Sequence, residues 1–318
     1  TFYVFFLSHS GKKNYLFRSK KIEGPWEKTV VEGNYHDASL LFDGGKAYIV
    51  YGNTEIYITE LNETLTGPKE GGLQRLLVKD KNHGGLGYEG AHIQKIGDWF
   101  YLFLINWPKG DVRTESCFRA KKLTDEFTGG VVLNDCRGIP GRGVAQGGIV
   151  ETEEGKWYAV LFQDMGAAGR MPILIPVTWK DEFPVFGTDG KIPEKIEIKE
   201  RAGYNYNPLY TSDDFYPKAG LPKNRQLAPQ WQWNHQPDNK LWNLLPGGGL
   251  EIKTGKLCIN LTHARNTLTQ RMLWPKCEAR VNIDSSKLND GDYAGFVLFR
   301  ADTPLWGSKK NWEPPFWW

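Results

Sequence analysis

A short hairpin pattern recurs along the first two thirds of the chain and restricts the folds that it can adopt. Each copy has β-branched and aromatic residues on both sides of a glycine-containing turn. The copies are Ser39–Tyr51, Ala91–Phe103 and Gly148–Val160. The period is about 55 residues, and further strand-like runs follow each hairpin. No stretch shows helical periodicity of useful length, so the chain is predicted to be all-β.

Four strands per unit at this period indicate a β-propeller, although a β-sandwich with irregular hairpins fits the same pattern. Residues 2–6 match the second strand of a hairpin, so the chain is expected to begin inside a blade. The repeat ends near residue 202, and we predict a catalytic propeller domain over 1–202 that lacks its first blade. Residues 203–318 alternate like a partial, incomplete β-sandwich, and the pattern breaks at 312–318 as in a truncated terminus.

The charge pattern argues against nucleic acid and membrane partners. The 40 basic and 37 acidic residues nearly cancel and are interspersed, leaving a formal net charge of +3. No apolar run is long enough to span a membrane, and no signal peptide is recognisable. The four cysteines are too widely spaced for a zinc site and are expected to be buried thiols, which favours a reducing, cytoplasmic compartment.

Polar residues stand in equivalent places before the three complete hairpins, namely Asp37, Glu89 and Gln146. The innermost strands of a propeller surround its central channel, so residues at the same strand end converge on one mouth. Paired carboxylates are what glycoside hydrolysis requires. The 13 tryptophans suit a sugar site as well, because sugar rings pack on aromatic faces. The alternatives are surface turn carboxylates and aromatic residues that only pack in strands.

The segments His36–Gly52, Tyr88–Ile93 and Gly143–Thr152 resemble glycoside hydrolase family 43, in the subgroup with a C-terminal sandwich. Trp231–His235 and Ala264–Arg271 resemble it too. This resemblance implies a five-bladed propeller and an inverting β-xylosidase or α-L-arabinofuranosidase that acts on hemicellulose oligosaccharides with broad specificity. It requires no cofactor and identifies no protein-bound metal, although it allows a calcium ion in the channel.

The resemblance also assigns roles to individual residues. Glu89 matches the general acid, and Asp37 matches the carboxylate that tunes this acid and holds substrate. Gln146 matches a polar residue on the central axis, and Arg170 matches an arginine that reaches the sugar. Trp107 is a candidate for stacking on a sugar, or a loop aromatic packed on a neighbouring blade.

His36 lies beside the candidate acids as a substrate-binding residue, or as an ordinary hydrogen-bonded histidine. No residue of the chain matches the family's general base. The enzyme reading therefore competes with a catalytically impaired propeller that binds sugar, and with a propeller that only supports the second domain. The incomplete blade leaves a sheet edge, from which we expect a homodimer.

Overall fold

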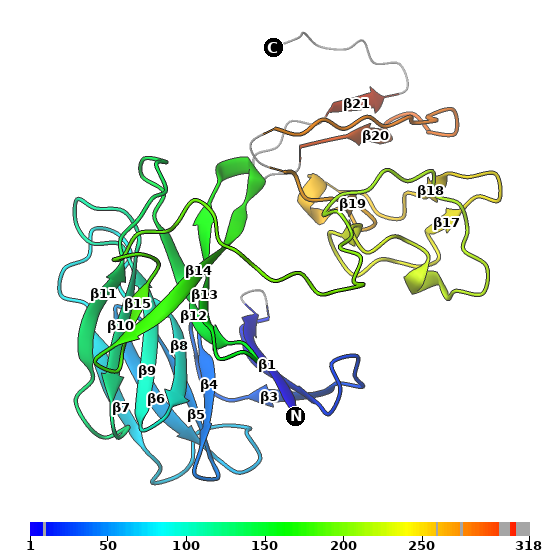
Figure 1. The fold of residues 1–318 in the computed structure, drawn as a ribbon. Coiled ribbons are helices and arrows are strands. Elements are labelled where there is room, and N and C mark those ends of the chain that lie inside the picture. Colours follow the sequence, from blue (N-terminus) through cyan, green and yellow to red (C-terminus); the bar gives the residue numbers. More distant parts are fainter. Residues whose placement is uncertain (9–10, 259, 274–275, 299–305, 310–318) are drawn as a thin grey trace. The chain divides into compact units, whose positions relative to one another are not determined.

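The computed structural model describes residues 1–8, 11–258, 260–273, 276–298 and 306–309, and the chain divides into two compact units, Thr1–Lys199 and Glu200–Trp318. The division lies close to the boundary expected at residue 202. The first unit contains four antiparallel sheets (Figure 1). Their strands are β1 (Phe2–Ser8), β2 (Lys13–Ser19) and β3 (Glu27–Val31); β4 (Ser39–Asp43), β5 (Lys46–Asn53), β6 (Glu55–Leu61) and β7 (Gln74–Lys79); β8 (Glu89–Ile96), β9 (Trp99–Asn106), β10 (Thr114–Ala120) and β11 (Thr128–Leu133); and β12 (Val144–Glu151), β13 (Trp157–Asp164), β14 (Arg170–Lys180) and β15 (Phe183–Phe186).

The predicted hairpins are confirmed as β4–β5, β8–β9 and β12–β13, and each leads into two further strands of the same sheet. The expectation of five blades is wrong for this chain. The described residues form four sheets, of which the first has three strands and the others have four. The repeat explains this number, since each sheet corresponds to one hairpin copy and residues 2–6 supply the remaining copy.

Hydrophobic side chains fill the space between consecutive sheets. One buried cluster joins the first and second sheets and includes Leu16 and Ile49. A second joins the next pair and includes Ile58 and Leu102, and a third joins the last pair through residues such as Phe103. Burial of this kind contributes about 25 cal/mol per Å² of apolar surface. Each sheet is therefore held face to face against its neighbour, as in a propeller.

The second unit has short strands and two 3₁₀ turns. Its antiparallel pairs are β16 (Gln232–Trp233) with β19 (Leu268–Thr269), β17 (Trp242–Leu244) with β18 (Leu250–Ile252), and β20 (Tyr293–Phe296) with β21 (Trp306–Lys309). The 3₁₀ turns are η2 (Lys223–Arg225) and η3 (Leu261–His263), and η1 (Gly166–Ala168) belongs to the first unit. Trp242 is buried and its ring lies 5.3 Å from that of Trp233. The segment 312–318 lies outside the described residues.

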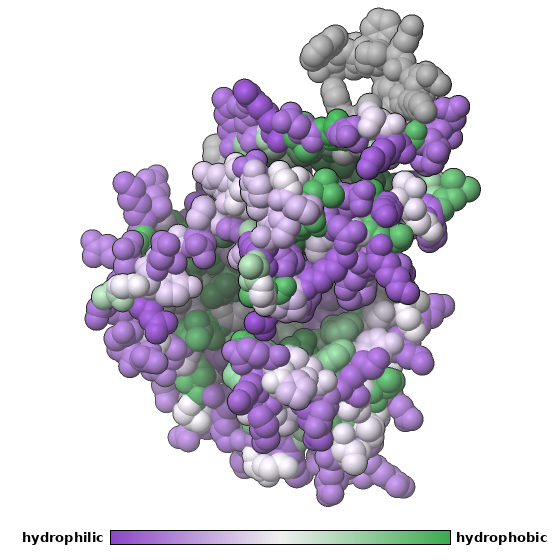
Figure 2. Space-filling model, turned by 90° about the vertical axis from the view of Figure 1, so that its right-hand side faces the viewer, coloured by the Kyte–Doolittle hydropathy of each residue, from purple (hydrophilic) through white to green (hydrophobic). Residues whose placement is uncertain are grey.

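The structure can be compared with the expectations about membrane spans and cysteines. Among the described residues, no helix is long and apolar enough to cross a membrane. The four cysteines are free thiols, but only Cys117 is buried, so the expectation of buried thiols is wrong for the others. These three lie in loops or in the second unit, where the cores described above do not cover them. Figure 2 shows one face of the molecule, mainly hydrophilic with hydrophobic residues in scattered patches.

Candidate active site

The candidate residues lie at the starts of neighbouring inner strands. Strand β8 contacts both β4 and β12. Glu89 is the first residue of β8, and Asp37 precedes β4 in a left-handed backbone conformation with φ of 45°. The backbone N–H of Ala91 donates to the carbonyl of Asp37 at 3.1 Å, which ties the two strand starts together. The repeated hairpins therefore place both carboxylates at one end of the first unit.

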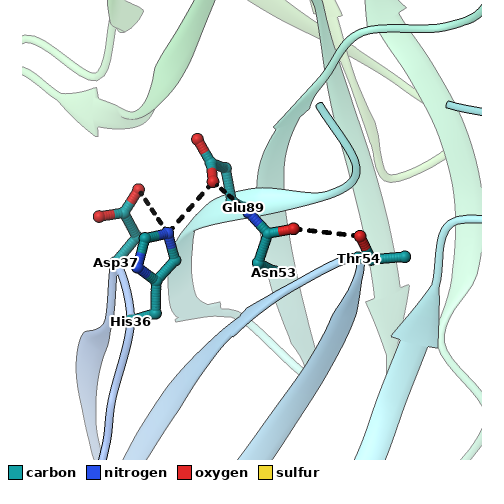
Figure 3. Close-up of polar contacts among 5 residues, drawn as sticks. All are labelled: His36, Asp37, Asn53, Thr54 and Glu89. Carbon is teal, nitrogen blue, oxygen red and sulfur yellow. Dashed lines mark hydrogen bonds and ion pairs between the residues drawn. The ribbon is translucent and has the colours of Figure 1, made fainter. Parts of the chain in front are cut away.

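His36 lies between the two carboxylates (Figure 3). Its Nε2 atom is 3.2 Å from Oε2 of Glu89 and 3.8 Å from Oδ2 of Asp37. The amide of Asn53, at the end of β5, donates to the same Oε2 atom at 2.6 Å. The side chain of Glu89 is only 15% exposed, whereas those of His36 and Asp37 are more than a third exposed. Glu89 is thus held from one side in a mostly enclosed position.

Among the described residues, the side-chain contacts of Glu89 involve Oε2 alone. This arrangement leaves Oε1 for a group outside the protein. A carboxyl group with one oxygen fixed and the other open is suited to passing a proton to a bound molecule. The cluster is therefore a candidate site for acid catalysis.

Gln146 lies on the neighbouring strand, close to the backbone of β8. A Cβ atom placed on Gly90 would lie 2.5 Å from Nε2 of Gln146, so the glutamine amide passes directly over this glycine. Gln146 itself has a φ of 65° within a bulge of β12, between Ala145 and Gly148. Bulges redirect side chains and are frequent beside active sites. The bulge and the missing side chain of Gly90 together place Gln146 next to Gly90, the residue after Glu89.

Glu115, a buried residue of β10, is hydrogen-bonded to the backbone of this bulge. Its Oε2 atom accepts a hydrogen bond from the backbone N–H of Gln146 at 2.7 Å. Its other oxygen has no hydrogen-bond partner, and the residue has no exposed surface. Burial raises the pKa of Glu115 to about 8, with the hydrogen bond from Gln146 acting in the opposite direction. Glu115 is therefore a neutral carboxylic acid near pH 7.

Trp107 and Arg170 belong to a second polar group, which is centred on Asp164. Arg170 is the first residue of β14, and its Nε atom lies 3.8 Å from Oδ1 of Asp164. Arg113 forms an ion pair with the same carboxylate and lies over the ring of Trp107, 5.6 Å from its centroid. Trp107 is 38% exposed, and its Nε1 donates to the carbonyl of Asp111. Among the described residues, the side-chain partners of Glu89 are His36 and Asn53 and do not belong to this group.

The sequence predicts Asp37, Glu89, Gln146 and His36 as site residues. Glu89 and Gln146 lie on β8 and β12, and His36 and Asp37 lie in the turn before β4. The sequence did not predict Asn53, Glu115, Arg113 or Asp164. Asn53 carries a weak signal, since it ends the second strand of a hairpin next to a glycine. Glu115 has none, because a glutamate inside a strand usually faces water.

One group of described residues could in principle hold a metal ion. It consists of His36, Asp37 and Glu89, whose ligand atoms all lie within 4.8 Å of one another. Calcium takes six to eight oxygen ligands, and this group offers oxygen from only two side chains. The donor set therefore fits calcium poorly.

Comparison with known proteins agrees with the fold. Residues 1–184 match the model for "Glycosyl hydrolases family 43", and residues 223–307 match "Beta xylosidase C-terminal Concanavalin A-like domain". A beta-xylosidase of Formosa agariphila is 28% identical over 88% of this chain and 56% of its own length. A non-reducing end alpha-L-arabinofuranosidase of Bacteroides ovatus is 24% identical over 95% of this chain and 58% of its own length.

A solved structure described as a bifunctional GH43-CE protein of Bacteroides eggerthii superposes with a TM-score of 0.81 and 38% identity, over 96% of this chain and 39% of that one. A second, an engineered GH43 glycoside hydrolase described as having endo-xylanase and exo-arabinofuranosidase activity, gives a TM-score of 0.73 at 27% identity over 96% and 59%. This chain spans little more than half the length of the curated relatives. With its first 184 residues matching the family model and carboxylates converging at its inner strand starts, the chain belongs to glycosyl hydrolases family 43.

Proposed function

We propose that this chain binds and cleaves the terminal xylose or arabinose of hemicellulose oligosaccharides, with inversion and with broad sugar specificity. Glu89 is the general acid that protonates the leaving oxygen through Oε1. Relatives named as a beta-xylosidase and as an alpha-L-arabinofuranosidase support this substrate class. The observation that carries the proposal is the enclosed Glu89, held through one oxygen by Asn53 and His36.

In this proposal Asp37 tunes and orients the acid, while Gln146 and Arg170 hold the sugar. An inverting enzyme separates its two carboxyl groups by roughly 6.5–9.5 Å, to admit a water molecule between them. The ligand atoms of Asp37 and Glu89 lie within 4.8 Å of each other, which argues against Asp37 as the base. Asp37 therefore stands beside the acid, on the same His36 side chain, rather than across a water molecule from it.

The alternative function follows from the short separation of Asp37 and Glu89, which leaves the general base unassigned. With the acid in place but without a base carboxylate, the site would bind sugars while hydrolysing them slowly. Loss of a general base typically costs 10²–10⁴-fold in rate. Binding and hydrolysis therefore have to be measured separately, by calorimetric titration with xylotriose and by release of p-nitrophenol from aryl xyloside and arabinofuranoside. Binding without release would favour the alternative. We propose further that neither function needs a metal, so EDTA should change neither measurement.

The test of Glu89 is the substitution Glu89→Gln, which keeps the size of the side chain and the contact with Asn53 but removes the proton. We expect the rate on xylobiose to fall by about 10²–10⁴-fold, because its leaving group needs protonation. Aryl substrates with acidic leaving groups should lose less, and sugar affinity should persist.

The matched control is Glu126→Gln at an exposed position, for which no loss is expected. Hydrolysis of xylobiose by Glu89→Gln at the rate of the unmodified chain would overturn the assignment.

A further inference from the structure

A pocket of about 320 Å³ opens between strand ends of the third and fourth sheets. It is lined by Trp107, Arg113, Pro140, Gly141, Arg142 and Asp164. Trp107 follows β9, Arg113 precedes β10, and Asp164 ends β13. The volume is at the lower end of the range for small-molecule sites, about 300–1,000 Å³. The pocket lies at the polar group centred on Asp164, and none of its lining residues is among the side-chain partners of Glu89.

The pocket has more positive than negative charge. Arg113 and Arg170 both approach the carboxylate of Asp164, as described above. Arg142 instead donates from Nη1 to the backbone carbonyl of Asp164, at 2.9 Å, so its charge faces a neutral partner. The nearby Asp111 carboxylate accepts hydrogen bonds only from neutral groups and adds one negative charge. Three guanidinium groups thus lie near two carboxylates, of which Asp164 is the one paired with arginine side chains.

The pocket is also close to the candidate acid. Ile105 of β9 pairs with Glu89 in the sheet, and the backbone N–H of Trp107 donates to the carbonyl of Leu86. Trp107 therefore lies two residues, or about 7 Å, farther along the strand than the position opposite Glu89. On the other side, Arg142 shortly precedes β12, which carries Gln146 over Gly90. A sugar next to the one at Glu89 would reach this pocket.

We propose that this pocket is a subsite for a hexuronic acid unit of a decorated oligosaccharide. The carboxylate of that unit pairs with the guanidinium groups of Arg142 and Arg113, whose planar forks match a carboxylate in two parallel hydrogen bonds. The sugar ring packs on the exposed part of Trp107, whose orientation is fixed by its bond to Asp111. This inference rests on the proposed function, because it requires an oligosaccharide at Glu89.

The test compares two ligands of equal length, xylotetraose and a xylotetraose that carries one glucuronic acid side group, by calorimetric titration of the whole chain. We expect the acidic ligand to bind at least tenfold more tightly at low ionic strength. Salt at about 1 M should remove most of this advantage, because it screens exposed charges over a few ångströms. Free glucuronate and free galacturonate, added as competitors, show which uronic acid fits.

Variants of Arg142 test whether this residue causes the preference for the acidic ligand. Arg142→Gln should reduce the ratio of acidic to neutral affinity to near one, and Arg142→Lys should restore it only in part. The control Arg18→Gln removes an exposed arginine from β2 and should leave the ratio unchanged. Melting curves of each variant show whether it is folded.

Three outcomes would overturn the inference. Equal affinity for the two ligands would do so while leaving the proposed function intact. Absence of binding by both ligands would contradict the proposed function as well. Competition by inorganic phosphate as strong as that by glucuronate would identify a general anion site instead.

Discussion

Glu115 links the stability of the fold to pH. Its pKa is raised to about 8 by burial, from an ordinary value of 4.5. Between these values the folded protein keeps a proton that the unfolded chain has released. The stabilisation from this group is therefore complete below about pH 4.5 and is lost as the pH rises through 8. The free energy of unfolding should fall by a few kcal/mol over this interval, at about 1.4 kcal/mol per unit.

The substitution Glu115→Gln tests this prediction, since glutamine cannot ionise and can still accept from the N–H of Gln146. Denaturant unfolding at pH 6 and pH 9 should show a large difference for the unmodified chain and a smaller one for the variant. Glu126→Gln serves as the exposed control. An equal loss of stability in all three proteins would show that Glu115 is not the responsible group.

At the same scale, the sequence predicts some site residues and not others. Asp37 and Glu89 can be predicted because the hairpin repeat assigns them equivalent places, and a repeat converts equivalent positions into neighbours in space. Asn53 and Glu115 cannot be predicted in this way. Their roles depend on contacts between different sheets, namely Asn53 with Glu89 and Glu115 with Gln146.

At the scale of elements, β8 and β12 pack closely because one of them presents a glycine. A Cβ atom placed on Gly148 would lie 2.2 Å from Cδ2 of His92. Gly148→Ala should therefore force the histidine or the strand to move and cost about 1–3 kcal/mol of stability. Thermal unfolding measures this loss.

The matched control is Gly130→Ala on β11, where a Cβ atom would meet nothing within 4 Å and φ is not positive. This variant should be nearly neutral, because the added methyl group has room. Equal melting temperatures for the two variants would contradict the close approach at Gly148.

The hairpins themselves are predictable because their turns and alternation are local features of the sequence. The number of sheets is harder to predict from the sequence. A repeat shows that blades are present, but the size of the ring depends on how each sheet packs on the next, through residues such as Ile49, Ile58 and Phe103. The resemblance to a five-bladed family therefore gave a number that the four sheets of this chain do not reach.

At the scale of the whole molecule, the first sheet differs from the others. Strand β1 pairs only with β2 among the described strands. Phe2, Val4 and Phe6 alternate along it and are each close to half exposed. An exposed apolar face favours association with another chain. These features support the proposal of a homodimer, because two-fold pairing is the commonest way to cover such a surface.

Light scattering coupled to size-exclusion chromatography tests this proposal on the chain as it stands. We expect a mass near twice 36.2 kDa at micromolar concentration. Phe6→Lys should shift the chain toward the monomer, because a charge on the apolar face opposes its burial. Val131→Lys, at an exposed position on β11, is the matched control and should leave the dimer intact.

A monomer at every concentration, or a dimer that Phe6→Lys does not weaken, would show that β1 is not the contact. Because a lysine on the outer face of β1 leaves the cluster around Glu89 untouched, sugar binding by Phe6→Lys also tells whether association is needed to complete the site.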